Sequence, residues 1–263
     1  MLLVIDIGNT NVVLGVYDGA VLKAHWRLAT DAKTTSDEYG ILLINLLASA
    51  RLLPVHISAA IMSSVVPALT STFETLIQQY FHQRPMVVTT ETDTGLRLRY
   101  ANPKEIGSDR LVNAAAAYHK YRRDLIVVDF GTATTFCTIT KEGEYLGGVI
   151  APGLGISAEA LFARAAKLSK VELTKPKTVI GVDTASSIQS GLLFGYAGLV
   201  DALVHRIEQE TGRSAYVIAT GGLSTVIVPE TTTIHKIEPM LTLEGLALLY
   251  RRATGNLSSA DWV

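Results

Sequence analysis

A repeat of eight residues constrains the fold of this chain more than any other feature. Leu3–Thr10 reads LVIDIGNT, and the pattern returns 123 residues later as IVVDFGTA in Ile126–Ala133. Each copy is a run of β-forming residues that ends in an Asp and continues into a Gly, which allows a tight turn. A second strand is expected after each turn, at Val12–Tyr17 and at Thr134–Thr140. The repeat therefore predicts two domains that begin in the same way.

Both predicted hairpins end in an acidic residue followed by a glycine, at Asp18-Gly19 and Glu142-Gly143. Such pairs favour tight turns between antiparallel strands. In the rest of each half, helix-like segments alternate with short β runs, which lie at Ile57–Met62, Met86–Thr89 and Tyr216–Ala219. This alternation predicts the α/β fold class.

The two halves are joined without a low-complexity linker. Ala114–Tyr121 has the pattern of a helix that crosses from one half to the other. We therefore expect an N-terminal domain over residues 1–118 and a C-terminal domain over residues 119–263. Domains of about 100–150 residues are the commonest size, so the chain length suits two of them.

Charge and composition narrow the class of partner. Hydrophobic residues make up 48% of the chain, charged residues 18%, and the formal net charge is −1. Balanced charge without a dense Lys/Arg run gives no electrostatic reason to expect a nucleic-acid or membrane partner. A small metabolite is expected instead. The single cysteine, Cys137, lies in an apolar strand pattern and is interpreted as a buried side chain in a reducing, cytoplasmic protein.

The turn after each Asp of the repeat has the composition of a phosphate-binding loop. Asp6–Asn11 combines a glycine with small hydrogen-bonding side chains, and Asp129–Thr135 repeats the pattern with hydroxyls. Backbone N–H groups in such turns bind anionic oxygens. A carboxylate beside a polyphosphate would repel it, so Asp6 and Asp129 make sense only if cations lie between them and the phosphates. The two turns therefore predict metal-dependent binding of a nucleotide.

The segment Gly107–Arg110 has two interpretations from its residues alone. Asp109 could accept a proton from an alcohol, with Arg110 beside it to pair with a carboxylate. It could equally stabilise the start of a helix near Leu111. Tyr100 is in the same way either a half-buried strand aromatic or a ligand contact, and Thr184 either a helix N-cap or a ligand contact.

The motifs together resemble those of a known family. The phosphate turns look like those of the superfamily that unites actin, sugar kinases and heat-shock chaperone ATPases. Within it, the chain is similar to type III pantothenate kinases in Gly107–Arg110, Gly147–Gly153 and Gly181–Thr184, from Met1 to about Ala253. The resemblance implies two duplicated ribonuclease H-like (actin-like ATPase) domains with a nucleotide cleft between them. It also implies ATP-dependent phosphorylation of pantothenate to 4'-phosphopantothenate, the first step of coenzyme A biosynthesis, by a homodimer.

The resemblance also assigns residues. It implies ATP binding by Asp6, Ile7, Gly8, Asn9, Thr10, Asn11, Val12, Val13 and Thr132. It implies pantothenate binding by Tyr100, Gly107, Ser108, Asp109, Arg110 and Thr184, with Asp109 as the catalytic proton acceptor. The implied cofactors are Mg²⁺ bound with ATP near Asp6 and a monovalent cation, K⁺ or NH₄⁺, at Asp129.

Two other functions stay open at this level. The superfamily turns do not identify the acceptor, so another small-molecule kinase would carry the same pattern. A non-catalytic ATP-binding accessory factor of transcription would also keep the nucleotide site. The apolar stretch Leu192–Val204 could supply a dimer interface or belong to the core. Gly153-Leu154-Gly155 imitates a dinucleotide-binding fingerprint and is interpreted as a backbone turn.

Overall fold

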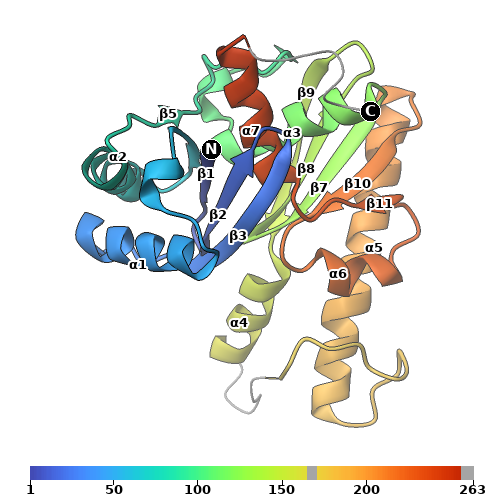
Figure 1. The fold of residues 1–263 in the computed structure, drawn as a ribbon. Coiled ribbons are helices and arrows are strands. Elements are labelled where there is room, and N and C mark those ends of the chain that lie inside the picture. The colour runs from blue at the N-terminus through green and yellow to red at the C-terminus, as the bar shows by residue number, and fades with distance from the viewer. Residues whose placement is uncertain (165–170, 256–263) are drawn as a thin grey trace. The chain divides into compact units, whose positions relative to one another are not determined.

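The structure, a computed structural model, describes residues 1–164 and 171–255, whose elements are labelled in Figure 1. The chain forms two compact units. Unit 1 contains Met1–Leu96, Ala101–Lys120 and the segment that starts at Leu241. Unit 2 contains Arg97–Tyr100 and Tyr121–Met240.

Unit 1 is built on a five-stranded sheet in the order β3-β2-β1-β4-β5. Its first three strands pair antiparallel, and β4 and β5 continue the sheet in the direction of β1. The strands are β1 (Leu2–Ile7), β2 (Asn11–Asp18), β3 (Val21–Ala29), β4 (Ala59–Ser64) and β5 (Met86–Val87). The hairpin predicted from the first copy of the repeat is therefore confirmed.

Unit 2 repeats this topology. Its sheet has the order β11-β10-β7-β8-β9-β6, with antiparallel β7-β8-β9 and with β10 and β11 parallel to β7. The strands are β6 (Arg97–Leu98), β7 (Leu125–Phe130), β8 (Ala133–Ile139), β9 (Glu144–Pro152), β10 (Tyr216–Thr220) and β11 (Lys236–Ile237). Apart from β6, each strand has a counterpart in unit 1. The predicted duplication within an α/β fold is confirmed.

Among the described residues, four helices belong wholly or mainly to unit 1, and they are α1 (Ser36–Ser49), α2 (Pro67–Phe81), α3 (Ser108–Tyr121) and α7 (Leu241–Ala253). Helix α1 begins at Ser36 because Thr35 and Glu38 form a reciprocal capping box in front of it. Helices α1 and α2 lie side by side (Figure 1), and their apolar side chains pack with those of β1, β2 and β4 in one core.

Strand β1 places its acidic residue away from that core. Leu3, Ile5 and Ile7 belong to the core formed with α1 and α2. Successive side chains of a strand point to opposite faces, so Asp6 lies on the other face, where α7 packs against β1. The carboxylate is therefore kept out of the largest apolar cluster of unit 1.

Helix α7 explains why unit 1 is discontinuous along the chain. An added Cβ at Gly245 of this helix would lie 2.6 Å from the Val112 carbonyl oxygen of α3, so the two helices pack with almost no space between them. The C-terminal helix thus completes the unit that starts at Met1. The division into domains of residues 1–118 and 119–263, expected from the sequence, stays a prediction.

Unit 2 carries α4 (Leu154–Arg164), α5 (Thr184–Thr211) and the short α6 (Ser224–Ile227). Helix α5 is long and apolar enough to cross a membrane by length and composition alone. A core helix passes the same test, and five side chains of the stretch Leu192–Val204 belong to the core of unit 2, namely Leu192, Leu193, Tyr196, Val200 and Val204. Of the two interpretations of this stretch, the structure supports the core for these side chains.

The remaining helical segments are single 3₁₀ turns at Pro54–His56, Pro103–Glu105 and Val228–Glu230. The predicted hairpin turn at Gly143 has φ +78°, and that at Gly19 has φ +59°, so both glycines adopt the left-handed conformation that such turns require. Cys137 is buried, as its sequence context predicts.

Candidate active site

The first phosphate turn connects β1 to β2. The Gly8 N–H donates to the Asn11 carbonyl at 3.0 Å, which closes the turn. Thr30, just after β3, braces it from outside: its hydroxyl donates to the Gly8 carbonyl at 2.7 Å, and its N–H donates to the Thr10 carbonyl at 3.0 Å. Thr30 was not among the predicted site residues, and its hydroxyl contact with Gly8 spans 22 positions of the chain.

The predicted ATP-binding residues of this turn differ in accessibility. Asn9 and Thr10 are exposed, and Gly8 and Asn11 are partly exposed. Ile7 and Val12 have no exposed surface and pack in the core of unit 1. A phosphate could therefore meet the tip of the turn but not these two apolar side chains.

Asp6 is a carboxylate in unusual surroundings. The Ser63 hydroxyl at the end of β4 donates to Asp6 Oδ1 at 2.6 Å. Burial raises the pKa of Asp6 to about 7, although the hydrogen bond from Ser63 opposes this rise; the charge of Asp109 adds to it and that of Arg27 opposes it. A cation beside Asp6 would favour its ionised form, so this carboxylate fits a site that binds a metal with its ligand.

Asp109 lies in the first turn of α3, which begins at Ser108. Burial raises the pKa of Asp109, while the Arg110 N–H, which donates to Asp109 Oδ1 at 2.8 Å, and the Arg110 charge oppose the rise. An added Cβ at Gly107 would come 2.5 Å from the same Oδ1. The glycine therefore leaves room for the carboxylate, and the residue after Asp109 holds it in place.

Two neighbouring serines connect Asp6 and Asp109. Ser63 binds Asp6, and Ser64 binds Ser108: the Ser64 N–H donates to the Ser108 hydroxyl at 3.0 Å, and that hydroxyl donates back to the Ser64 carbonyl at 3.1 Å. The end of β4 therefore fixes the start of α3 beside the end of β1. Both predicted acidic groups of unit 1 are brought together in this way.

The second phosphate turn, between β7 and β8 in unit 2, is one residue shorter than the first. The Gly131 N–H donates to the Ala133 carbonyl at 3.1 Å, and the Gly153 N–H donates to the Thr132 carbonyl at 3.1 Å. Gly153 lies between β9 and α4, whereas Leu154 and Gly155 are the first two residues of α4, so the interpretation of Gly153-Leu154-Gly155 as a turn is correct for Gly153 and wrong for the other two. Asp129, near the end of β7, is partly exposed.

The turn after β10 packs directly on Asp129. Gly221 has φ +89°, and an added Cβ there would lie 2.5 Å from Asp129 Oδ1. The glycine is therefore required both by its conformation and by the carboxylate. Asp129 offers a hard cation the oxygen ligand that such ions prefer.

Tyr100 and Thr184 also lie in unit 2. Tyr100 is half-buried just after β6, with its ring 6.4 Å from that of Tyr145. Thr184 is exposed and is the first residue of α5. The N-cap is Asp183, whose carboxylate accepts from the Ser186 N–H at 2.7 Å, so the alternative interpretation of Thr184 as the cap was wrong.

Comparison with known proteins identifies the family of this chain. A family model described as type III pantothenate kinase matches residues 2–206. The chain belongs to the type III pantothenate kinase family. A type III pantothenate kinase from Geobacter sulfurreducens is 54% identical over 252 residues, with 96% of this chain and 99% of that protein covered. One from Syntrophus aciditrophicus is 52% identical over the same coverage.

Solved structures support the fold of this type III pantothenate kinase family member. A Campylobacter jejuni protein named as a Baf family transcriptional activator has a TM-score of 0.61 at 17% identity, covering 97% of this chain and all of that one. The ROK hexokinase from Thermus thermophilus has a TM-score of 0.51 at 11% identity, covering 97% and 99%. At these identities the likeness concerns the fold alone, and it is that of the sugar kinases.

Proposed function

We propose that this chain transfers the γ-phosphoryl group of ATP to the primary hydroxyl of pantothenate and forms 4'-phosphopantothenate. The observation that carries the proposal is the half-buried carboxyl of Asp109, which β4 holds in place through the Ser64–Ser108 hydrogen bonds in a member of the pantothenate kinase family. The product is the substrate of the next step toward coenzyme A.

Asp109 acts as the proton acceptor in this reaction. The hydroxyl oxygen forms a bond to the γ-phosphorus, the bond from that phosphorus to the β-γ bridging oxygen breaks, and ADP leaves with the electron pair. The hydroxyl proton passes to the Asp109 carboxylate. Such proton transfer typically contributes about 10²–10⁴ in rate. The raised pKa of Asp109 makes the carboxylate a stronger base than an exposed Asp.

Cations complete the nucleotide site. Mg²⁺ bound with ATP would neutralise phosphate charge, as in other phosphoryl transfers. Asp6 would hold it, and the tips of the turns at Gly8–Asn11 and Thr132 would bind phosphate oxygens through backbone N–H groups. Asp129 would hold a monovalent cation, K⁺ or NH₄⁺, as the family resemblance implies.

The substrate contacts of the proposal involve five further positions. Gly107 and Ser108 shape the backbone beside Asp109, and Arg110 would pair with the carboxylate of pantothenate. Tyr100 and Thr184 would contact the rest of the molecule. We also propose that the chain is cytoplasmic, in line with its single, buried cysteine, and that it works as a homodimer, as the family resemblance implies.

A substrate panel tests the proposal against the other kinase functions. Release of ADP would be followed by a coupled assay with pantothenate, glucose, mannose and N-acetylglucosamine, each with Mg²⁺ and either KCl or NaCl. We expect turnover with pantothenate and none with the three sugars, and a higher rate in KCl than in NaCl. Turnover with a sugar and none with pantothenate would replace the proposal by a sugar kinase function. Tight ATP binding without phosphorylation of any acceptor in the panel would favour the alternative of a non-catalytic accessory factor.

A further inference from the structure

The short segment Arg97–Tyr100 belongs to unit 2. The residues before and after it, Leu96 and Ala101, belong to unit 1. Within the segment, β6 contains two residues at the edge of the unit 2 sheet. Its backbone bonds to the sheet are few: the Arg97 N–H donates to the Gly143 carbonyl at 2.8 Å, and the Arg99 N–H donates to the Tyr145 carbonyl at 2.9 Å. So short a strand has little pairing energy of its own.

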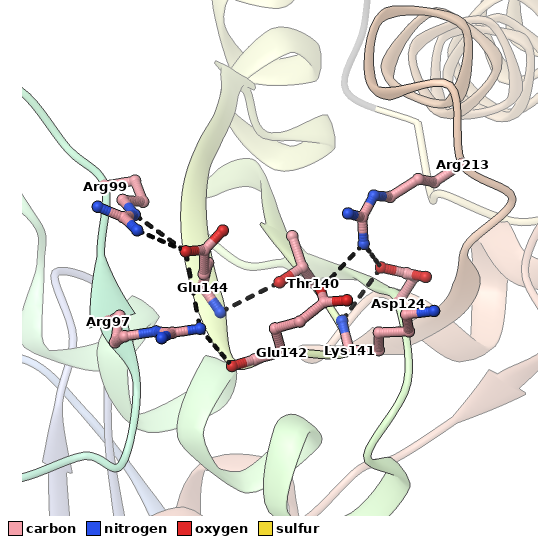
Figure 2. Close-up of polar contacts among 8 residues, drawn as sticks. All are labelled: Arg97, Arg99, Asp124, Thr140, Lys141, Glu142, Glu144 and Arg213. Carbon is pink, nitrogen blue, oxygen red and sulfur yellow. Dashed lines mark hydrogen bonds and ion pairs between the residues drawn. The ribbon is translucent and has the colours of Figure 1, made fainter.

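Side chains supplement this pairing, as Figure 2 shows. Arg99 directs two nitrogens at one oxygen of Glu144: Nε and Nη2 donate to Oε1 at 3.1 and 2.6 Å. Arg97 Nη2 lies 3.7 Å from the same oxygen and donates to the Glu142 carbonyl at 3.1 Å. We call the contacts of Arg97 and Arg99 with Glu144 the Glu144 clamp. Because two guanidinium groups share one carboxylate, the clamp holds the first residue of β6 and the residue after β6 on β9.

Tyr100 follows the clamp directly and lies against a fixed surface. An added Cβ at Gly147 would lie 3.4 Å from the Tyr100 ring, in ordinary contact distance, and Gly147 has φ +119°. The ring of Tyr145, 6.4 Å from that of Tyr100, has no exposed surface. The ring therefore has a defined seat on β9, and what brings it there is the attachment of Arg97 and Arg99 one to three residues earlier.

We propose that Arg99 and Glu144 are positioning residues that seat Tyr100 on β9 for contact with pantothenate. The inference rests on the proposed function, in which Tyr100 contacts that substrate. Glu144 has no other assigned role. Loss of its charge would weaken the contact with Arg99, whose hydrogen bond a Gln can still accept, and would loosen β6 and the position of the Tyr100 ring. Binding of pantothenate would therefore weaken, while ATP binding and the chemical step would not.

The same network provides a matched control. The Glu142 side chain accepts from Arg213 Nη1 at 3.0 Å, and Arg213 also contacts Asp124 at 2.8 Å. Arg97 uses only the backbone carbonyl of Glu142. Glu142→Gln therefore removes one exposed carboxylate two residues from Glu144 and leaves the clamp in place.

The experiment compares Glu144→Gln with Glu142→Gln in the full chain by steady-state kinetics with varied pantothenate and varied ATP. We expect Glu144→Gln to raise the KM for pantothenate by roughly two- to fivefold, because Arg99 is largely exposed and exposed ion pairs contribute modestly. The KM for ATP, kcat and Tm should stay near the wild-type values, and Glu142→Gln should leave all four unchanged. The charge swap Arg99→Glu with Glu144→Arg should restore part of the lost affinity.

A double-mutant comparison separates positioning from general stabilisation. In a Tyr100→Ala background, Glu144→Gln should have no further effect on the KM for pantothenate, because the ring that it positions is gone. Two results would overturn the positioning role of Arg99 and Glu144: additive effects of Tyr100→Ala and Glu144→Gln, or the same KM for pantothenate in Glu144→Gln and Glu142→Gln. If the wild-type chain still phosphorylates pantothenate, the proposed function stands in either case. A wild-type chain that does not phosphorylate pantothenate would overturn both.

Discussion

Replacing Asp6 by Asn should stabilise the ligand-free protein while it destroys activity. The pKa of Asp6 is raised from 3.8 to about 7 in the folded chain, chiefly by burial. The folded chain therefore binds more protons than the unfolded chain between these two values, and its stability falls as pH rises through this range. At pH 8 the raised pKa of Asp6 lowers the stability by about 4 kcal/mol as an upper bound, and at pH 5, where the folded carboxyl is protonated, it lowers the stability by less than half of that. The amide that replaces the carboxylate has no charge and can still accept the hydrogen bond from Ser63.

The assay is thermal unfolding of the ligand-free chain at both pH values. A change of 1 kcal/mol shifts Tm by about 2–4 °C in a chain of this size. We therefore expect Asp6→Asn to raise Tm by roughly 5 °C or more at pH 8 and by less than half of that at pH 5. Asp18→Asn, which changes an exposed carboxylate at the last residue of β2, is the control and should show no such difference.

With saturating Mg²⁺ and ATP, the wild-type chain should have a higher Tm than Asp6→Asn, which is the reverse of the order without ligand. The wild-type chain should gain Tm on adding both, since ligand that binds only the folded state stabilises it, and Asp6→Asn should gain much less. Two results would refute this reasoning: a lower Tm of ligand-free Asp6→Asn at pH 8, or a Tm difference that does not depend on pH. Either would show that burial does not destabilise the ionised form of Asp6 in the absence of a cation.

Three further changes test separate parts of the structure. Gly221→Ala should displace the Asp129 carboxylate, so its activity should lose the difference between KCl and NaCl; a variant that keeps this difference would remove Asp129 from cation binding. Ser108→Ala should remove both hydrogen bonds to Ser64, lower stability by about 1–2 kcal/mol and raise the KM for pantothenate; unchanged denaturant midpoint and KM would contradict this. Thr35→Ala should lose the α1 capping box and lower Tm by about 2–4 °C without altering kinetics, and altered kinetics would show that the cap reaches the site.

The sequence predicted the elements that have local signals. The strands of both hairpins, their glycine turns and the helix that begins near Leu111 follow from residues adjacent in the chain, and all are present. The N-cap of α5 was misplaced by one residue, because Asp183 and Thr184 are both good caps and only the hydrogen bond to Ser186 distinguishes them.

The contacts that hold the site could not be predicted, because they join distant segments. Ser63 binds Asp6 across 57 positions, and Arg99 binds Glu144 across 45. Neither pair has a local pattern. The return of α7 to unit 1 depends in the same way on close packing at Gly245, which is legible only once both helices are placed. Local chemistry thus indicated the turns and acids, while the tertiary structure supplied their supports.

The central claim is that Asp109 accepts the hydroxyl proton of pantothenate while ATP phosphorylates it. The most direct measurement is the formation of 4'-phosphopantothenate, followed by mass spectrometry, for wild type and Asp109→Asn under the same Mg²⁺, ATP and KCl. We predict product from the wild-type chain and a kcat lower by about 10²–10⁴ in the folded variant, with ATP binding retained. A near-normal kcat in Asp109→Asn would contradict the claim.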